Sequence, residues 1–187
     1  MQLITYISSI IPVSDQLENA LNSLSQKKEF PKNEVVLDSG ERCTELLFID
    51  KGLFRGYYYD EDGKEITGWF ARENEFATSF YSFISNEPAP ENIQALESCE
   101  VTVLSHSVLQ SLYINFPETE RIGRIITENY YIKLEERLLG LQFKTARERY
   151  GNLVHSKPKL LQRVPLGQIA SYLGITQETL SRIRAGT

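Results

Sequence analysis

The chain has 187 residues, 41% of them hydrophobic, which is typical of one large or two small globular domains and excludes a disordered segment. The sequence holds no run of about 18 apolar residues, so we expect no membrane span and no membrane partner. Residues 1–15 contain an apolar patch but lack a basic stretch and a small-residue cleavage site. We therefore expect a cytoplasmic protein in which this segment packs as an amphipathic helix.

The net charge of −5 is divided unevenly along the chain. Residues 1–132 carry 10 Lys and Arg against 21 Asp and Glu, a net charge of −11. Residues 133–187 carry 10 Lys and Arg against 4 Asp and Glu, a net charge of +6. Such asymmetry favours a protein in which one module meets phosphate groups. The alternative is a basic face that is merely solvated.

Few side chains are available for metal or covalent chemistry. Cys43 and Cys99 lie far apart and outside any CxxC pair, so we expect buried thiols and neither a zinc nor an iron–sulfur site. His106 and His155 are the only histidines. A small-barrel enzyme of the cupin type, which binds a metal through several histidines, is therefore a weak alternative. We expect no catalytic residues and no metal ligands.

In chain order, residues 14–28 predict a helix, because apolar side chains recur at helical spacing from Leu17 to Leu24. From residue 30 to 105 the pattern changes to short β-rich runs separated by glycine-containing turns. This spacing predicts a compact antiparallel barrel or roll. The predicted strands are residues 34–37, 45–50, 53–59, 65–70 and 100–104, and residues 86–92 are predicted to form a loop.

A long helix is predicted over residues 117–143. Pro117 suits its first turn, and Glu118 and Glu120 lie where the helix dipole favours negative charge. This helix carries two rows of apolar side chains, and each row needs a partner to cover it. One partner is the roll of the same chain, and the other is the corresponding helix of a second subunit. A long helix buried within a monomer is the alternative. The row expected at the homodimer interface is Ile122, Ile125, Asn129, Ile132, Glu136 and Leu139, and the other is Ile126, Tyr130, Leu134, Leu138 and Leu141.

Residues 164–187 carry the pattern of a helix-turn-helix. Apolar side chains recur on one face of each of two short segments, which Gly174 separates. Gly174 can take the positive φ of a tight helix exit, and small Ala170 lets two helices approach closely. Thr176 is placed to cap a second helix that runs to about Arg184 and enters a major groove. The alternative is an ordinary helical hairpin packed on a core. The apolar positions are Leu166, Ile169, Ala170, Leu173, Leu180 and Ile183.

The sequence predicts an α+β chain with an N-terminal antiparallel β-roll, a long helix and a C-terminal helix-turn-helix. In this order of parts it resembles the Crp/Fnr family of bacterial transcription regulators. The resemblance implies a homodimer on a two-fold symmetric DNA site, with RNA polymerase and a small-molecule effector as further partners. It implies an effector domain at 1–116, a dimerisation helix at 117–143 and a DNA-binding domain at 144–187. The matching stretches are Phe30-Pro31 with Gly40-Glu41, LLFIDKGLFRGYY (46–58), ENEFATSF (73–80), QALESCEVTVLS (94–105) and ASYLGITQETLSRIR (170–184).

The family's DNA-reading positions correspond to Gln177, Glu178 and Arg182. Arginine donates two hydrogen bonds to guanine, glutamate accepts from the cytosine amino group, and glutamine pairs with adenine or holds a phosphate. Thr176 and Thr179 are expected to contact phosphates from the helix N-terminus, although Thr176 is equally well explained as a cap. The complete set expected to bind DNA is Thr176, Gln177, Glu178, Thr179, Ser181, Arg182 and Arg184. The sequence stops soon after this helix, so we expect no C-terminal wing.

The family's effector site corresponds to Thr78, Ser79, Ala89 and Pro90. Relatives that bind cyclic nucleotides have an arginine there, which neutralises the phosphate, and this arginine is absent. Glu91 adds a repelling charge, so we expect no cyclic AMP. Cysteine clusters and the haem histidine of other relatives are likewise not seen, so no cofactor is expected. A sensor that acts through a protein partner remains an alternative. The aromatic residues Trp69, Phe70, Phe76, Phe80, Tyr81 and Phe83 are either core or a site for a different effector.

Overall fold

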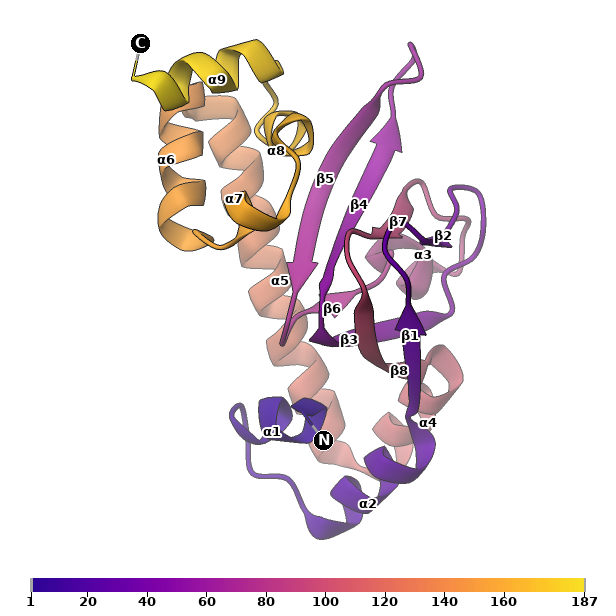
Figure 1. Ribbon diagram of the computed structural model, residues 1–187. Helices are drawn as coiled ribbons and strands as arrows, with labels where there is room; N and C mark the ends of the chain where they lie inside the picture. The colour runs from indigo at the N-terminus through magenta and orange to yellow at the C-terminus, as the bar shows by residue number, and fades with distance from the viewer. Residues whose placement is uncertain (1, 187) are drawn as a thin grey trace. The chain divides into compact units, whose positions relative to one another are not determined.

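The computed structural model describes residues 2–186, which form an α+β fold of two compact units (Figure 1). The first, here the roll unit, contains the described residues up to Tyr58 together with Trp69–Ile126. The second, here the C-terminal unit, contains Tyr59–Gly68 and the described residues from Thr127 onward. The boundaries predicted at residues 116 and 143 separate functional regions, namely the effector domain, the dimerisation helix and the DNA-binding domain. The two compact units instead meet within the long helix, between Ile126 and Thr127, and within the hairpin that contains Tyr59–Gly68.

The roll unit is built on two four-stranded sheets, with strand orders β1-β8-β3-β6 and β2-β7-β4-β5. The pairs β1–β8, β3–β8 and β4–β7 are antiparallel, which confirms the predicted antiparallel roll. The strands are β1 (Gln26–Phe30), β2 (Val35–Leu37), β3 (Glu45–Lys51), β4 (Leu53–Tyr59), β5 (Glu65–Arg72), β6 (Phe76–Ala77), β7 (Asn92–Ala95) and β8 (Cys99–Ser105).

An apolar core fills the space inside the roll. In β8, alternate side chains from Cys99 to Val103 point inward and pack with Phe54 of β4. Gly52, between β3 and β4, has a φ of +112°, and a Cβ there would lie 2.4 Å from the Cys99 sulfur. Only glycine therefore allows the turn between β3 and β4 to approach β8 this closely. Cys99 is buried as predicted, whereas Cys43 is only half-buried.

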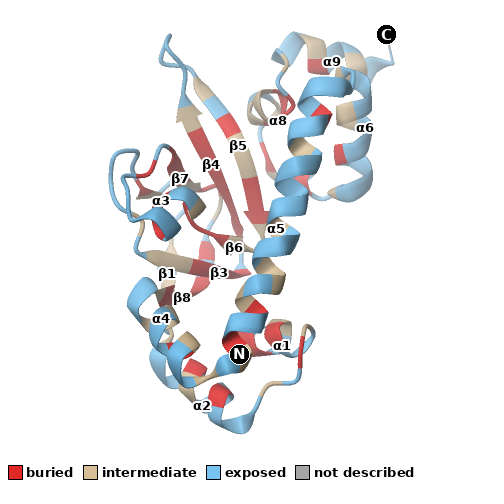
Figure 2. Ribbon diagram, turned by 180° about the vertical axis from the view of Figure 1, so that it is seen from behind, coloured by how far each residue is buried: buried red, intermediate tan, exposed pale blue. Residues whose placement is uncertain are grey.

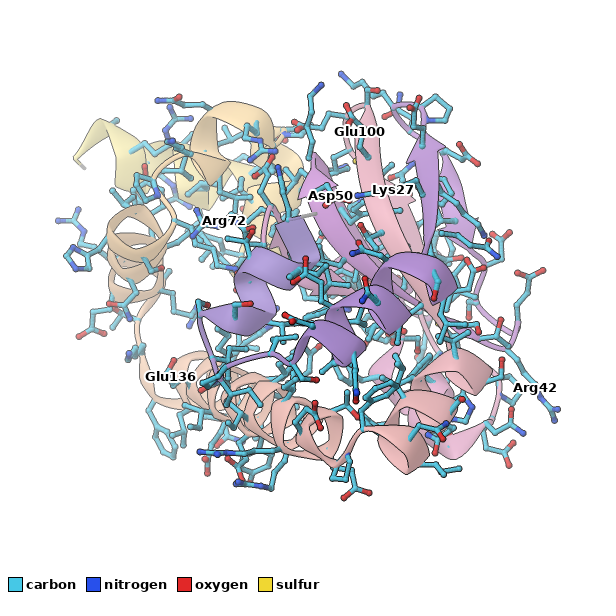
Figure 3. The ribbon with its side chains drawn as sticks, turned by 90° about the horizontal axis from the view of Figure 1, so that it is seen from below. Lys27, Arg42, Asp50, Arg72, Glu100 and Glu136 are labelled. Carbon is cyan, nitrogen blue, oxygen red and sulfur yellow. The ribbon has the colours of Figure 1, made fainter. Side chains whose placement is uncertain are left out.

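A buried carboxylate ties three neighbouring strands together. Asp50 of β3 is 9% exposed, and its Oδ2 accepts hydrogen bonds of 2.7 Å from Lys27 of β1 and from Thr102 of β8. Figure 3 shows Lys27 and Asp50 directed toward each other. Burying a carboxylate is costly unless it is paired in this way, so the pair fixes β1 in its position.

The helices of the roll unit cover a second apolar core around Phe48 and Leu104. Ser14 caps the second helix by accepting a hydrogen bond from the Leu17 amide at 3.2 Å. The predicted helix 14–28 is too long, because Gln26 already pairs with Val103 of β8. The strands β1, β6 and β7 and the helices α3 and α4 were not predicted. The helices are α1 (Gln2–Ser8), α2 (Asp15–Leu24), α3 (Phe80–Ser85), α4 (His106–Asn115) and α5 (Pro117–Phe143), of which α5 continues into the C-terminal unit.

The helix α5 has 27 residues and the predicted bounds. After it, Thr145 and Glu148 form a capping box in which each side chain satisfies the other's backbone N–H. None of the helices within residues 2–186 has the combined length and apolarity needed to cross a membrane. The remaining helices are α6 (Ala146–Ser156), α7 (Leu160–Arg163), α8 (Leu166–Tyr172) and α9 (Gln177–Ala185).

Candidate nucleic-acid interface

The turn between α8 and α9 depends on Gly174. Its φ is +65°, in the left-handed region, and the Ile175 amide donates to the Ala170 carbonyl at 3.0 Å. A Cβ at Gly174 would also lie 3.2 Å from the Cδ2 atom of Leu141. The backbone conformation therefore favours glycine here, and a Cβ would in addition press on the Leu141 side chain.

Both helices bury the predicted apolar face. Ile169 and Ala170 are 1% exposed, and Leu180 is fully buried. Leu173 is 3% exposed at the end of α8, where its amide donates to the Ile169 carbonyl. This packing orients α9 so that its opposite face points to solvent.

The N-terminus of α9 is capped by Thr176. Its Oγ1 accepts a hydrogen bond from the Thr179 amide at 3.2 Å, so this hydroxyl is the N-cap of α9. Next to it, a hydrogen bond from its own backbone amide lowers the pKa of Glu178, and the Thr176 hydroxyl lowers it further. The charges of Arg182 and Lys64 act in the same direction. Glu178 is therefore ionised and able to accept hydrogen bonds at neutral pH.

The solvent face of α9 carries most of the residues predicted to bind DNA. The guanidinium of Arg182 donates to the Thr179 hydroxyl at 3.3 Å, and this hydroxyl lies 3.1 Å from that of Thr176. Thr179 is half-buried, unlike the others, and it orients Arg182 rather than facing outward. The exposed members are Thr176, Gln177, Glu178, Ser181, Arg182 and Arg184.

Two basic residues of the C-terminal segment hold the turn instead of facing a ligand. Arg137 of α5 donates to the Tyr172 carbonyl at 2.9 Å, and its guanidinium lies 4.0 Å from the Tyr172 ring centroid. Arg149 of α6 donates to the Leu173 carbonyl at 2.9 Å. The carbonyls at a helix C-terminus lack intrahelical partners, so these cations stabilise the end of α8. Sequence reasoning counted both with the basic face and missed this role.

The hairpin between β4 and β5 also contacts α8. The Thr67 amide donates to the Ser171 hydroxyl at 2.9 Å, and this hydroxyl donates to the Glu65 carbonyl at 3.2 Å. Nothing in the sequence pattern indicated this contact, because it joins residues 104 positions apart.

The polar groups of the predicted effector site belong to the roll's own structure. Thr78 is 3% exposed and donates to the Glu45 carbonyl at 3.0 Å. Ser79 is fully buried and caps α3 by accepting from the Ser82 amide. Ala89 packs in the apolar core, whereas Pro90 is exposed. The hydroxyls of Thr78 and Ser79 are therefore already engaged in hydrogen bonds within the roll.

The Trp69 indole packs against the same apolar core as Ala89. It lies directly over Gly56, where an added Cβ would be 2.1 Å from the indole Cε2. Phe70 and Phe83 are buried as well, at 6% and 7% exposure, whereas Tyr81 is 59% exposed. This arrangement favours a core role for most of the aromatic set.

The row predicted at the dimer interface is divided between two environments. Ile122 is 5% exposed and belongs to the core around Phe48, and Ile125 packs against that core. Ile132 and Leu139 are 52% and 47% exposed, and Figure 2 shows the helix largely exposed along this later part. The polar members Asn129 and Glu136 are exposed too.

No group of three or more His, Cys, Asp or Glu residues with metal-binding geometry occurs in the described part of the chain.

Comparison with known proteins agrees with this architecture. Residues 27–115 match the family described as the cyclic nucleotide-binding domain. The Anaerobic regulatory protein of Aggregatibacter actinomycetemcomitans is 26% identical over 180 residues, which cover 90% of this chain and 68% of the relative.

Two solved structures share the fold. FixK2 of Bradyrhizobium japonicum has a TM-score of 0.76 at 20% identity, covering 87% of this chain and 83% of that one. A protein of Eubacterium rectale, described as of the Crp/Fnr family, has a TM-score of 0.74 at 12% identity over 97% of this chain and 87% of that one. The two structures show the fold of this chain, and its matched domain and its regulatory relative make it similar to the Crp/Fnr family of transcription regulators.

Proposed function

We propose that the chain is a homodimeric, sequence-specific DNA-binding regulator that does not respond to cyclic AMP. The observation that carries the proposal is the α8–α9 pair, with Gly174 in a left-handed conformation, Thr176 as a cap and a polar outer face on α9. A helix held in this way presents its first turns to a major groove.

The outer face of α9 offers different chemistry to different bases. Arg182 can donate two hydrogen bonds to guanine O6 and N7, and ionised Glu178 can accept from a cytosine amino group. Gln177 suits adenine or a phosphate. Each such contact is worth about 1–3 kcal/mol of base discrimination. The exposed side chains of Arg147 on α6 and of Lys159 supply charge for the DNA backbone.

The proposed dimer seam lies on the later part of α5. Ile132 and Leu139 are seven residues apart, so they recur on one face of the helix, and both are about half exposed in a single chain. Asn129 and Glu136 flank this row and can fix its register. Ile122 is left out of the seam because it lies in the core of its own chain.

Three features argue against a cyclic nucleotide in the roll. Ala89 replaces the arginine that relatives use for the phosphate, and it is 2% exposed within an apolar core. Trp69 packs over Gly56 in that same core. Glu91 is 4% exposed and adds negative charge nearby in sequence. A charged phosphate would lose its hydration there without gaining a cation.

Changing Arg182 to Ala should remove the preference for one base pair in each half-site, because its hydrogen bonds to guanine are lost. Selection of binding sites from a random DNA pool measures this. The preference for the correct base at that position should fall by about 5- to 160-fold, which corresponds to about 1–3 kcal/mol. Arg147→Ala is the matched control, since it removes an exposed positive charge on α6, which should weaken binding to all sequences and leave the base preference unchanged. If the Arg182 variant selects the same sequence as the parent, Arg182 does not read a base, and failure of the parent to select any sequence would refute DNA reading altogether.

Titration calorimetry with cyclic AMP and with cyclic GMP should give no binding heat for the parent protein. The physical reason is that Ala89, at 2% exposure, packs in an apolar core with Trp69 and offers no charge to a phosphate. Sub-micromolar affinity for either nucleotide would contradict this expectation. It would favour a nucleotide sensor, the alternative reading of the roll.

A further inference from the structure

Arg149 joins the ends of two helices within the C-terminal unit. It lies on α6 and is half-buried. Its Nη1 donates to the Lys144 carbonyl at 2.6 Å, directly after α5 ends, and its Nε donates to the Leu173 carbonyl at 2.9 Å, where α8 ends. Carbonyls at a helix C-terminus lack partners within their own helix, so one guanidinium satisfies an acceptor at each of these ends. The α8–α9 turn, 24 positions after Arg149, is thereby tied to the junction between α5 and α6.

The junction between α5 and α6 is itself held by local hydrogen bonds. The Lys144 amide donates to the Gly140 carbonyl at 3.1 Å, so the hydrogen-bond ladder of α5 continues up to the cap of α6. Thr145 and Glu148 form the capping box at the start of α6. The Arg149 amide donates to the Thr145 carbonyl at 3.0 Å. Arg149 therefore projects from a fixed point at the end of α5.

Two other contacts with the α8–α9 turn come from one face of α5. Arg137 donates to the Tyr172 carbonyl at 2.9 Å, and the Leu141 side chain lies against Gly174, where a Cβ would be 3.2 Å from its Cδ2. Arg137 and Leu141 are four residues apart, so they lie one above the other along the helix. Contacts along a single line do not prevent rotation about that line. Arg149 comes from a different helix and supplies the contact that opposes this rotation.

The direction of α9 decides which DNA sites a dimer can bind. The Ile175 amide donates to the Ala170 carbonyl at 3.0 Å across the turn, so α8 and α9 move together. Two recognition helices of a dimer fit half-sites whose centres are about 34–36 Å, or a multiple of this, apart. A rotation of the α8–α9 pair against α5 changes this separation and leaves the side chains on the outer face of α9 as they are.

We propose that Arg149 is a positioning residue that fixes the direction of α9 relative to α5 and so determines the half-site spacing that the dimer accepts. The inference rests on the proposed function, namely a dimer that binds DNA through α9. It assigns to Arg149 no contact with a base or a phosphate, because both of its printed donors are engaged with backbone carbonyls.

Binding to DNA sites of altered spacing tests the proposal. Adding or removing two base pairs between the half-sites that the parent selects rotates one of them by about 70° around the duplex. The parent should bind these sites about 100-fold more weakly, because only one half-site is then engaged at a time. Arg149→Lys keeps the charge, but an ammonium group does not reproduce the fork of the guanidinium. In this variant the loss on altered spacing should fall to about 10-fold or less.

Arg147→Lys is the matched control, since Arg147 is an exposed arginine two residues earlier on α6, and it should behave as the parent does. An undiminished spacing preference in Arg149→Lys would overturn the proposal. Loss of the base preference within a half-site would also overturn it, because Arg149 would then support the fold of the helix-turn-helix and not its direction.

Pulsed electron paramagnetic resonance tests the same role without DNA. Spin labels on Glu135→Cys of α5 and Ser181→Cys of α9, two exposed positions, report the distance between these helices. Cys43→Ser removes the half-buried thiol, and Cys99 is fully buried and should stay unlabelled. An excess of unlabelled chain restricts the measured distances to pairs within one chain.

In this measurement Arg149→Lys should broaden the distribution of distances, and Arg147→Lys should leave it as in the parent. A distribution that Arg149→Lys does not change would show that Arg149 does not fix α9. If the parent selects no DNA sequence at all, the proposed function fails, and the distance distribution still decides whether Arg149 holds the direction of α9.

Discussion

Gly56 and Trp69 form one packing unit at the residue scale. Gly56 lies on β4, and the indole of Trp69 on neighbouring β5 occupies the space where a Cβ would be. Aromatic rings bury a large area when they pack, and this ring packs against the core of the roll. Position 56 thus needs glycine because the Trp69 indole fills the space of a side chain, and not because of its backbone conformation.

Gly56→Ala should lower the free energy of unfolding by about 1–3 kcal/mol, because the new methyl group collides with a buried indole. Urea unfolding followed by circular dichroism measures it. Gly151→Ala is the control, since a Cβ there meets nothing within 4 Å. It lies within α6 and should be neutral or stabilise by up to about 1 kcal/mol. Equal stability of Gly56→Ala and the parent would show that the indole can move away.

At the scale of single elements, the start of α6 depends on local electrostatics. The Oε2 of Glu148 accepts hydrogen bonds of 2.8 Å from the Thr145 amide and from the Thr145 hydroxyl. The backbone hydrogen bond, followed by the side-chain one, lowers the pKa of Glu148 below its ordinary value of 4.5. A lowered folded-state pKa means that the carboxylate stabilises the fold above pH 4.5. This contribution disappears as the pH falls through the folded-state pKa.

Thr145→Ala should raise the pKa of Glu148 toward its ordinary value, because the hydroxyl donor is lost while the backbone donor remains. Carbon-detected NMR titration of the carboxyl group measures the change. Loss of the cap should also destabilise the protein by about 1 kcal/mol at neutral pH. In Glu148→Gln, the acid-dependent part of this stability should be absent. An unchanged titration of Glu148 in Thr145→Ala would show that the hydroxyl is not a donor in solution.

At the scale of the whole molecule, α5 is the element shared by both units and by the proposed dimer. Its first turns pack against the core around Phe48 through Ile122, while its later turns expose Ile132 and Leu139. A single chain gains nothing by exposing a row of large apolar side chains, so a second copy of the helix is the simplest cover.

The double variant Ile132→Asp with Leu139→Asp should sediment as a monomer, because charges cannot be buried in an apolar seam without partners. Sedimentation velocity gives the mass, and binding to a two-fold symmetric DNA site should weaken in parallel. Ile114→Asp is the matched control, since Ile114 is 82% exposed on α4. It should leave the oligomeric state unchanged. A persistent dimer in the double variant would place the interface elsewhere.

The sequence by itself determined the elements whose signals are local. Gly174, Thr176 and the apolar spacing around them predicted the helix-turn-helix, and Pro117 marked the start of α5, because caps and periodicity act within a few residues. Short strands such as β6 and β7 carry too few residues for a period, so they escaped prediction.

The tertiary structure alone decided which polar side chains are available. Arg137 and Arg149 look like part of a basic face in the sequence, yet both bind carbonyls at the end of α8. Ser171 meets Thr67 across 104 positions, and Ile122 is withdrawn into the core of its own chain. Hydrogen bonds and burial between distant segments depend on how the chain folds back on itself, and no local pattern of residues encodes that.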